Sequence, residues 1–127
     1  MGLSPEILRK RTFDFALNTL RTIEGLKKSM SNEVMSKQVV RSATSVGANY
    51  RAACKAKSTA DFINKLKIVE EESDESVYWL ELIKAHNQIN DSNYELLLKE
   101  SKELEKIFAA SAITAKNNKL NSSHNRQ

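Results

Sequence analysis

Apolar and polar positions alternate at helical spacing along most of the chain and predict four helices. In the third and fourth segments the core-facing positions are separated by four and three residues in turn, which is typical of helices that pack side by side in a bundle. These positions are Phe62, Leu66, Val69, Ser73, Ser76, Leu80 and Ile83, followed by Tyr94, Leu97, Ser101, Leu104, Phe108, Ser111 and Ala115.

The second segment repeats this spacing with smaller side chains. Its core-facing positions are Met35, Val39, Ser42, Val46 and Ala53, with Ala43, Ser45, Ala48 and Ala52 beside them. Gly47 lies inside the segment, where glycine costs about 1 kcal/mol relative to alanine. We therefore expect either a close helix contact or a local bend at Gly47.

Capping signals divide the chain into helices. Ser4 before Pro5 begins the first helix, which we expect to run to about residue 28. Ser31 begins a second helix over about 32–57, Ser58 a third toward residue 86, and Ser92 with Glu95 a fourth. Residues 1–116 are thus predicted to form one bundle domain, and the polar residues 117–127 a disordered tail.

The first helix is apolar on more than one side. Leu8, Phe15 and Leu26 form one arc, whereas Phe13, Leu17 and Leu20 form another that a monomer would leave exposed. Contiguous exposed apolar surface usually marks an interface. We therefore predict a homo-oligomer whose interface residues are Phe13, Leu17, Leu20, Trp79 and Leu82.

Composition limits the compartment and the chemistry. Charged residues interrupt every apolar stretch, no secretion signal is recognisable, and Cys54 is the single cysteine, so we expect a cytoplasmic protein without disulfides or membrane contact. Cys54 itself is predicted to be a buried or half-buried structural thiol. No nucleophile, base and orienting group can be assembled, so no catalytic residue, no cofactor and no enzymatic activity are expected.

Acidic residues concentrate between positions 70 and 75 but do not predict a metal site. A carboxylate metal site in a helical bundle also requires Glu-x-x-His elements, which the chain lacks. A solvated or ion-paired acidic face is the better interpretation, with Arg41 and Arg51 as partners.

Positive charge gives the clearest functional signal. The formal net charge is +4 and the pI is about 9.2. Basic residues gather around the junction of the second and third helices, where Lys and Arg would bind phosphate without reading bases, although a solvated basic face has the same pattern. The candidate nucleic-acid-binding residues are Arg41, Arg51, Lys55, Lys57, Lys65 and Lys67.

Three blocks of sequence resemble a known bacterial family. They are Ser45-Val46-Gly47-Ala48-Asn49, then Ser58 through Asp61-Phe62 to Lys65-Leu66, then Glu75 through Tyr78-Trp79-Leu80-Glu81-Leu82. With this spacing, the region from Phe13 to Ala112 resembles the four helix bundle protein family, also called the 23S rRNA intervening-sequence protein or S23 family. A related branch comprises the accessory variability determinants of diversity-generating retroelements.

The resemblance implies an up-and-down antiparallel four-helix bundle that assembles as a homopentamer. In the related branch, basic pentamers bind a reverse transcriptase and nucleic acid. The expected function is weak, electrostatic binding of RNA or DNA by an oligomeric bundle. The alternative is a scaffold or accessory subunit for a protein partner such as a reverse transcriptase, without direct nucleic-acid binding.

Overall fold

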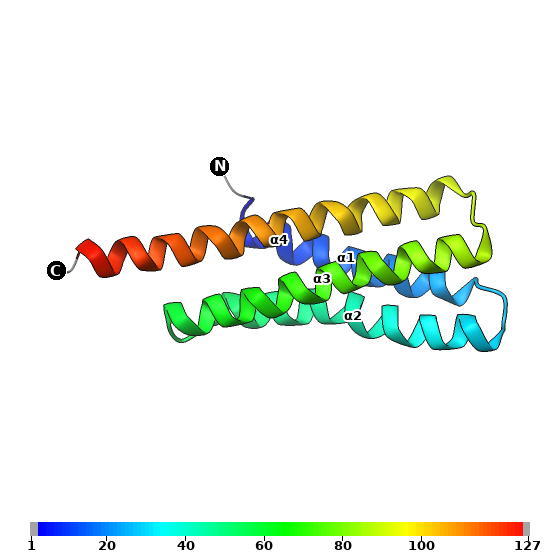
Figure 1. Cartoon of the computed structure of the whole chain (residues 1–127), viewed down its shortest axis with the longest axis horizontal. Helices are drawn as coiled ribbons and strands as arrows, with labels where there is room; N and C mark the ends of the chain where they lie inside the picture. Colours follow the sequence, from blue (N-terminus) through cyan, green and yellow to red (C-terminus); the bar gives the residue numbers. More distant parts are fainter. Residues whose placement is uncertain (1–2, 126–127) are drawn as a thin grey trace.

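Helices account for nearly all of the chain in the computed structural model, which describes residues 3–125 (Figure 1). They are α1 (Pro5–Glu24), α2 (Met30–Cys54), α3 (Thr59–Asn87) and α4 (Ser92–Asn125), and no strand occurs in this range. Short turns reverse the chain after each helix, so successive helices run in opposite directions (Figure 1). The predicted all-helical, four-helix architecture is confirmed.

Two predicted helix starts are confirmed by their caps. The Oγ atom of Ser4 accepts a hydrogen bond from the backbone N–H of Ile7 at 3.2 Å, and that of Ser58 accepts from the N–H of Asp61 at 3.1 Å. Each bond satisfies one of the amide groups that the first turn of a helix leaves without a backbone partner.

The other two starts were predicted slightly wrongly. Helix α2 begins earlier than expected, because Ser29 rather than Ser31 adopts an extended backbone and accepts from the N–H of Asn32 at 3.1 Å. Helix α4 is capped by Asp91, whose Oδ1 accepts from the N–H of Asn93 at 2.9 Å, so Ser92 is the first helical residue and not the cap.

Helices α1 and α2 end earlier than predicted, at Glu24 and Cys54 rather than near residues 28 and 57. Gly25 follows α1, and the backbone of Lys55 leaves the helical region after α2. Helix α3 ends one residue beyond the predicted His86. It is closed by Gln88 in the left-handed conformation at φ 52°, ψ 45°.

The last helix differs most from the prediction. Residues 117–127 were predicted to be a disordered tail, but α4 continues through this region to Asn125, and residues 126–127 lie outside the described range. Extending an existing helix adds one hydrogen bond for each residue fixed, so the segment needs no core contact of its own to be helical. The end of α4 therefore projects beyond the other three helices (Figure 1).

The hydrophobic core follows the predicted positions closely. In α2 all five predicted positions are buried, whereas Phe62 in α3 and Ser111 and Ala115 in α4 are only half-buried. The aromatic ring of Tyr50 packs against Phe108 with centroids 5.3 Å apart. The largest apolar side chains that are fully buried are Phe108, Leu66, Leu80, Ile83, Leu104, Val39, Val46 and Val69.

Helices α1 and α2 are in close contact at Gly47. A Cβ atom built on Gly47 would lie 3.2 Å from the Oγ1 of Thr12 and 3.3 Å from its Cβ. Thr12 is fully buried, and its hydroxyl donates to the carbonyl of Leu8 at 2.8 Å, so it has little room to move. Of the two expectations for Gly47, the structure shows the close helix contact.

Polar side chains join consecutive helices. Asn32 and Asn87 exchange two amide hydrogen bonds, at 2.9 and 2.8 Å, between α2 and α3. The phenol of Tyr94 donates to the carbonyl of Leu80 at 2.6 Å. Burial raises the pKa of Tyr94, so this phenol keeps its proton and remains a donor.

Replacing Gly47 with leucine should push α1 away from α2. We expect Gly47→Leu to lower the free energy of unfolding by about 1–3 kcal/mol, the usual cost of overpacking. Urea denaturation at a fixed chain concentration measures the change. The matched control is Gly25→Ala, because a Cβ there would make an ordinary contact at 3.5 Å. Equal effects of the two substitutions would contradict the close-contact explanation.

Candidate nucleic-acid interface

The structure brings three of the predicted basic residues together at one end of the bundle. Arg51 lies in the last turn of α2, and Lys55 and Lys57 lie in the turn that leads to α3. All three are exposed. None of them forms an ion pair with another residue in the range 3–125. Their positive charge is therefore directed to solvent.

Arg41 is placed differently. It lies ten residues before Arg51, about 15 Å along the helix at 1.5 Å per residue. Its guanidinium donates to Glu72 at 2.8 Å and to Glu75 at 2.5 Å, which confirms Arg41 as a partner of the acidic run. A phosphate would have to compete with two carboxylates for this side chain, so Arg41 is a poorer candidate than Arg51.

Glu75 is the centre of this α2–α3 ion pair. Its Oε1 accepts from Arg41 and from the indole N–H of Trp79, the latter at 3.2 Å. These bonds favour the charged carboxylate, that from Arg41 most strongly, and lower the pKa of Glu75. The acidic face is therefore partly ion-paired through Arg41, as the sequence indicated, whereas the prediction of Arg51 as a second partner is wrong because Arg51 forms no ion pair within residues 3–125.

Lys65 and Lys67 also differ from each other. The ammonium of Lys65 donates to both carboxylate oxygens of Asp61, at 2.7 and 2.8 Å, and this bond lowers the pKa of Asp61. Lys67 is exposed and forms no ion pair within the described chain. Its charge adds to the basic surface on the α3 side, whereas that of Lys65 is largely compensated.

Sequence reasoning missed three basic residues at the same end. Because the helices alternate in direction, the start of α1 and the end of α4 lie at the end of the bundle that carries the α2–α3 turn (Figure 1). Arg9 comes from α1, and the exposed Lys116 and Lys119 from the projecting part of α4. The alternation itself is the signal that could have found them. We call Arg9, Arg51, Lys55, Lys57, Lys116 and Lys119 the basic end.

The predicted interface residues occupy two different faces. Phe13 is 65% exposed, and it lines a groove of about 320 Å³ between α1 and α2 together with the half-buried Leu17 and Leu20. Leu82 is exposed on α3. Trp79 is half-buried, packs against the core and donates to Glu75, so much of its surface is already covered.

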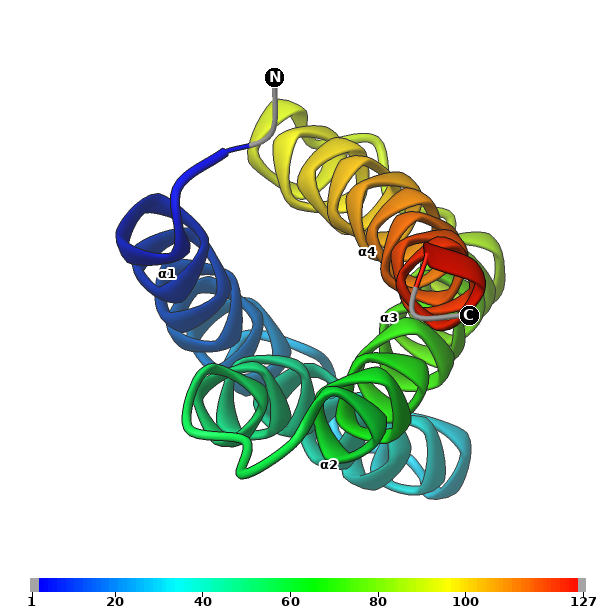
Figure 2. The same ribbon diagram turned by 90° about the vertical axis from the view of Figure 1, so that its left-hand side faces the viewer.

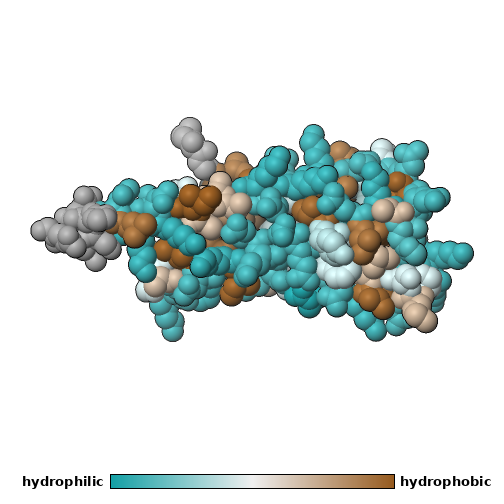
Figure 3. Space-filling model, viewed as in Figure 1, coloured by the Kyte–Doolittle hydropathy of each residue, from teal (hydrophilic) through white to brown (hydrophobic). Residues whose placement is uncertain are grey.

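The face formed by α3 and α4 is mostly hydrophilic, with hydrophobic residues in separate patches (Figure 3).

Cys54 is exposed, which contradicts the prediction of a buried or half-buried thiol. Residues 3–125 contain no group of three or more His, Cys, Asp or Glu side chains arranged to bind a metal ion. No helix in this range is long and apolar enough to cross a membrane.

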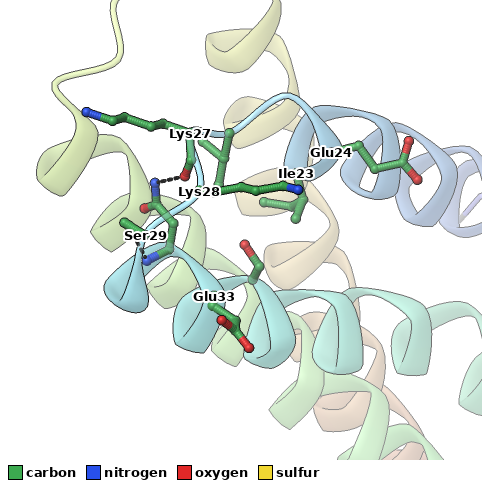
Figure 4. Close-up of a pocket in the computed structure, with 9 residues that line it drawn as sticks. Ile23, Glu24, Lys27, Lys28, Ser29 and Glu33 are labelled. Atoms are coloured by element: carbon green, nitrogen blue, oxygen red, sulfur yellow. Dashed lines mark hydrogen bonds between the residues drawn. The ribbon is translucent and has the colours of Figure 1, made fainter.

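The opposite end of the bundle has a hollow beside the α1–α2 turn, about 720 Å³ in volume (Figure 4). It is lined by acids as well as bases, including Glu24, Lys28 and Glu33. The buried Asn32 donates to the carbonyl of Lys27 at 2.8 Å and thereby holds the turn. Mixed charge and a structural role for its amide make this hollow a weaker candidate for phosphate binding than the basic end.

These features define an all-helical four-helix protein with a group of uncompensated positive charges at the basic end. Comparison with known proteins gives the family. The 23S rRNA-intervening sequence protein family matches residues 7–110, and the chain belongs to this family.

A solved structure is also similar. It is a protein of unknown function from the S23 ribosomal protein family of Bacteroides thetaiotaomicron, 36% identical in sequence. The match covers 87% of this chain and 98% of that chain, with a TM-score of 0.77. No curated protein matches the chain.

The ion pair at Glu75 should make stability depend on pH. Because folding lowers the pKa of Glu75, its contribution is fully present above the usual glutamate value of about 4.3 and is lost as the pH falls through the lowered value. We expect Glu75→Gln to reduce the free energy of unfolding at pH 7 by up to about 1 kcal/mol, the upper range for a partly exposed pair.

The difference between Glu75→Gln and the parent should narrow at pH 3. Urea denaturation at both pH values and one chain concentration measures it. Glu105→Gln is the control, because Glu105 lies in the middle of α4 and forms no ion pair within residues 3–125. A difference that stays constant between pH 7 and pH 3 would argue against the ion pair as its source.

Proposed function

We propose that this protein is a non-enzymatic, self-associating helical bundle that binds RNA or DNA electrostatically through its basic end. The observation that carries the proposal is the group of exposed, uncompensated charges around the α2–α3 turn, Arg51, Lys55 and Lys57. They lie on short, neighbouring segments, so one backbone of phosphates can contact all three. Lys67 extends the same surface along α3.

The chemistry of this surface suits phosphate better than base recognition. Lysine presents a compact charge on a flexible stem, which neutralises phosphate without fixing a sequence-specific geometry. Tyr78, which is 57% exposed, lies on the outer face of α3 and not among the basic end residues. Affinity should therefore come mainly from counterion release and fall steeply as salt rises.

Self-association would strengthen binding by this surface. The homopentamer implied by the family resemblance would repeat the basic end five times, and a closed ring would place all copies on one side of the assembly. The family's name refers to insertions in ribosomal RNA genes and does not identify a ligand. The distribution of charge is the physical support for nucleic acid.

A second candidate function is a scaffold for another protein, such as a reverse transcriptase. The exposed apolar surface around Phe13 favours this alternative, because it suits a protein contact better than a phosphate backbone. The two functions differ in their response to salt. An apolar protein contact should change little between 50 and 200 mM salt, a range over which phosphate binding weakens strongly.

Reversing two charges at the basic end tests nucleic-acid binding. We expect Lys55→Glu combined with Lys57→Glu to weaken binding to single-stranded RNA and DNA at least about tenfold at 50 mM salt. The slope of log affinity against log salt should fall by about 1.4 for the two lost phosphate contacts. Fluorescence anisotropy of labelled 20-nucleotide strands measures both quantities.

The matched control is Lys27→Glu combined with Lys28→Glu. It makes the same change in net charge with two exposed lysines at the opposite end of the bundle. Nucleic-acid binding through the basic end requires the first pair to lose much more affinity than the second. Equal losses of affinity in the two double variants would show that only the net charge of the protein matters. If the parent protein binds no nucleic acid, the scaffold function is the better explanation.

A further inference from the structure

Two exposed surfaces with apolar side chains remain after the bundle has formed. The first is the α1–α2 groove, whose lining includes Arg9, Phe13, Leu17, Leu20, Ala48 and Arg51. Gly47 lies in the floor of the groove and contributes no side chain where the two helices meet. Phe13 and the aliphatic residues give it an apolar middle, and the two arginines place positive charge at one end.

The second surface is a stripe on the outer side of α3. Its residues recur at helical spacing opposite the buried positions, and each of them is exposed. Tyr78 is 57% and Leu82 38% exposed, so the stripe presents apolar surface as well as charge. We call Glu71, Asp74, Tyr78, Glu81 and Leu82 the α3 stripe.

The two surfaces have opposite charge. From residue 68 to residue 83, α3 contains no Lys, Arg or His. Glu71 and Asp74 have no ion-pair partner within residues 3–125, and the same is true of Arg9 and Arg51. Each surface therefore carries uncompensated charge that the other would neutralise. The contact would engage Arg9 and Arg51 and leave Lys55 and Lys57, which do not line the groove, as the basic-end charges available to phosphate.

The surfaces also match in length and in order. The groove runs from Arg9 to Leu20 along α1 and the stripe from Glu71 to Leu82 along α3, and in each case the first and last residues are eleven positions apart. This corresponds to about 16 Å at 1.5 Å per residue. Each begins with uncompensated charge, at Arg9 or at Glu71 and Asp74, and ends with an apolar residue, Leu20 or Leu82. Glu81, beside Leu82, is ion-paired with Lys102 of its own chain at 3.5 Å. If α3 lay in the groove parallel to α1, charge would therefore meet charge and apolar surface would meet apolar surface.

A single chain cannot make this contact. Helices α1 and α3 are diagonal in the bundle and do not pack on each other, whereas every other pair except α2 and α4 does. Viewed from the end, α1 and α3 lie on opposite sides (Figure 2). The groove and the stripe therefore face in different directions and can meet only between chains.

We propose that the α1–α2 groove of one copy receives the α3 stripe of a second copy. This inference deepens the self-association in the proposed function and names the surfaces that carry it. The contact joins unlike patches, so each copy has one groove and one stripe to offer. Contacts of this kind link each copy to the next. The copies form a closed ring when the rotations between neighbours add up to a full turn.

Mixing two blocked variants tests the inference. Phe13→Glu places a carboxylate in the groove, facing the acidic stripe, and Tyr78→Glu removes the central aromatic side chain of the stripe and adds charge. Both residues are mainly exposed, so both variants should fold, which circular dichroism and thermal unfolding verify. Each variant alone should run as a 14.4 kDa monomer in light scattering after size exclusion.

An equimolar mixture should contain a species of twice the monomer mass and nothing larger. The intact stripe of the Phe13→Glu variant can enter the intact groove of the Tyr78→Glu variant. No further copy can join this pair, because the groove of the first variant and the stripe of the second are both blocked. The control is Leu96→Glu, because Leu96 is 65% exposed on α4, outside both surfaces. This variant should keep the parent's mass.

The outcomes separate this inference from the proposed function. A monomeric parent would overturn both the self-association and the contact described here. If either Phe13→Glu or Tyr78→Glu leaves the mass of the oligomer at the parent's value, only the groove and stripe contact is overturned. A mixture of the two variants that stays monomeric would also overturn only that contact. Nucleic-acid affinity at the basic end is measured independently through Lys55 and Lys57.

Discussion

The close approach of α1 to α2 at Gly47 is the constraint on which the rest of this structure depends. Because no side chain separates Gly47 from Thr12, α1 lies low against α2 and buries Leu8 and Phe15. The same packing leaves Phe13 outside, above a groove floored by small residues. The core and the unfilled surface beside it thus have one common cause, the lack of a Cβ at one position.

Ion pairs between the helices decide which charges remain available to a ligand. Arg11 donates two hydrogen bonds to Glu100 between α1 and α4, and Arg41 joins α2 to two carboxylates of α3. Such bonds fix the register of neighbouring helices and compensate their own charge. Part of the positive charge that is left lies beyond neighbouring helices, because Lys55 and Lys57 are in the α2–α3 turn and the end of α4 projects past the rest of the bundle (Figure 1).

The helical repeat made most of the fold predictable. The core positions of α2 and most of those of α3 and α4 follow from spacings of three and four, since such residues share one side of a helix. Helix limits were less predictable. Ser29 and Ser31 both lie at the start of α2, and only backbone geometry selects Ser29 as the cap. The polar composition of residues 117–125 does not show that α4 continues through them.

The sequence by itself determined the four helices, their buried sides and the excess of basic residues near the second turn, because these depend on local spacing and composition, whereas the choice between a close contact and a bend at Gly47 required the packing of Thr12 against it. Only the tertiary structure decided which basic residues stay uncompensated. In the sequence, Arg41 and Lys65 were as good candidates as Arg51 and Lys55. In the structure, Arg41 and Lys65 donate hydrogen bonds to carboxylates, whereas Arg51 and Lys55 form no ion pair within residues 3–125. The addition of Arg9 and Lys116 to the basic end, and the separation of Phe13 and Leu82 onto different faces, likewise depend on how distant segments pack.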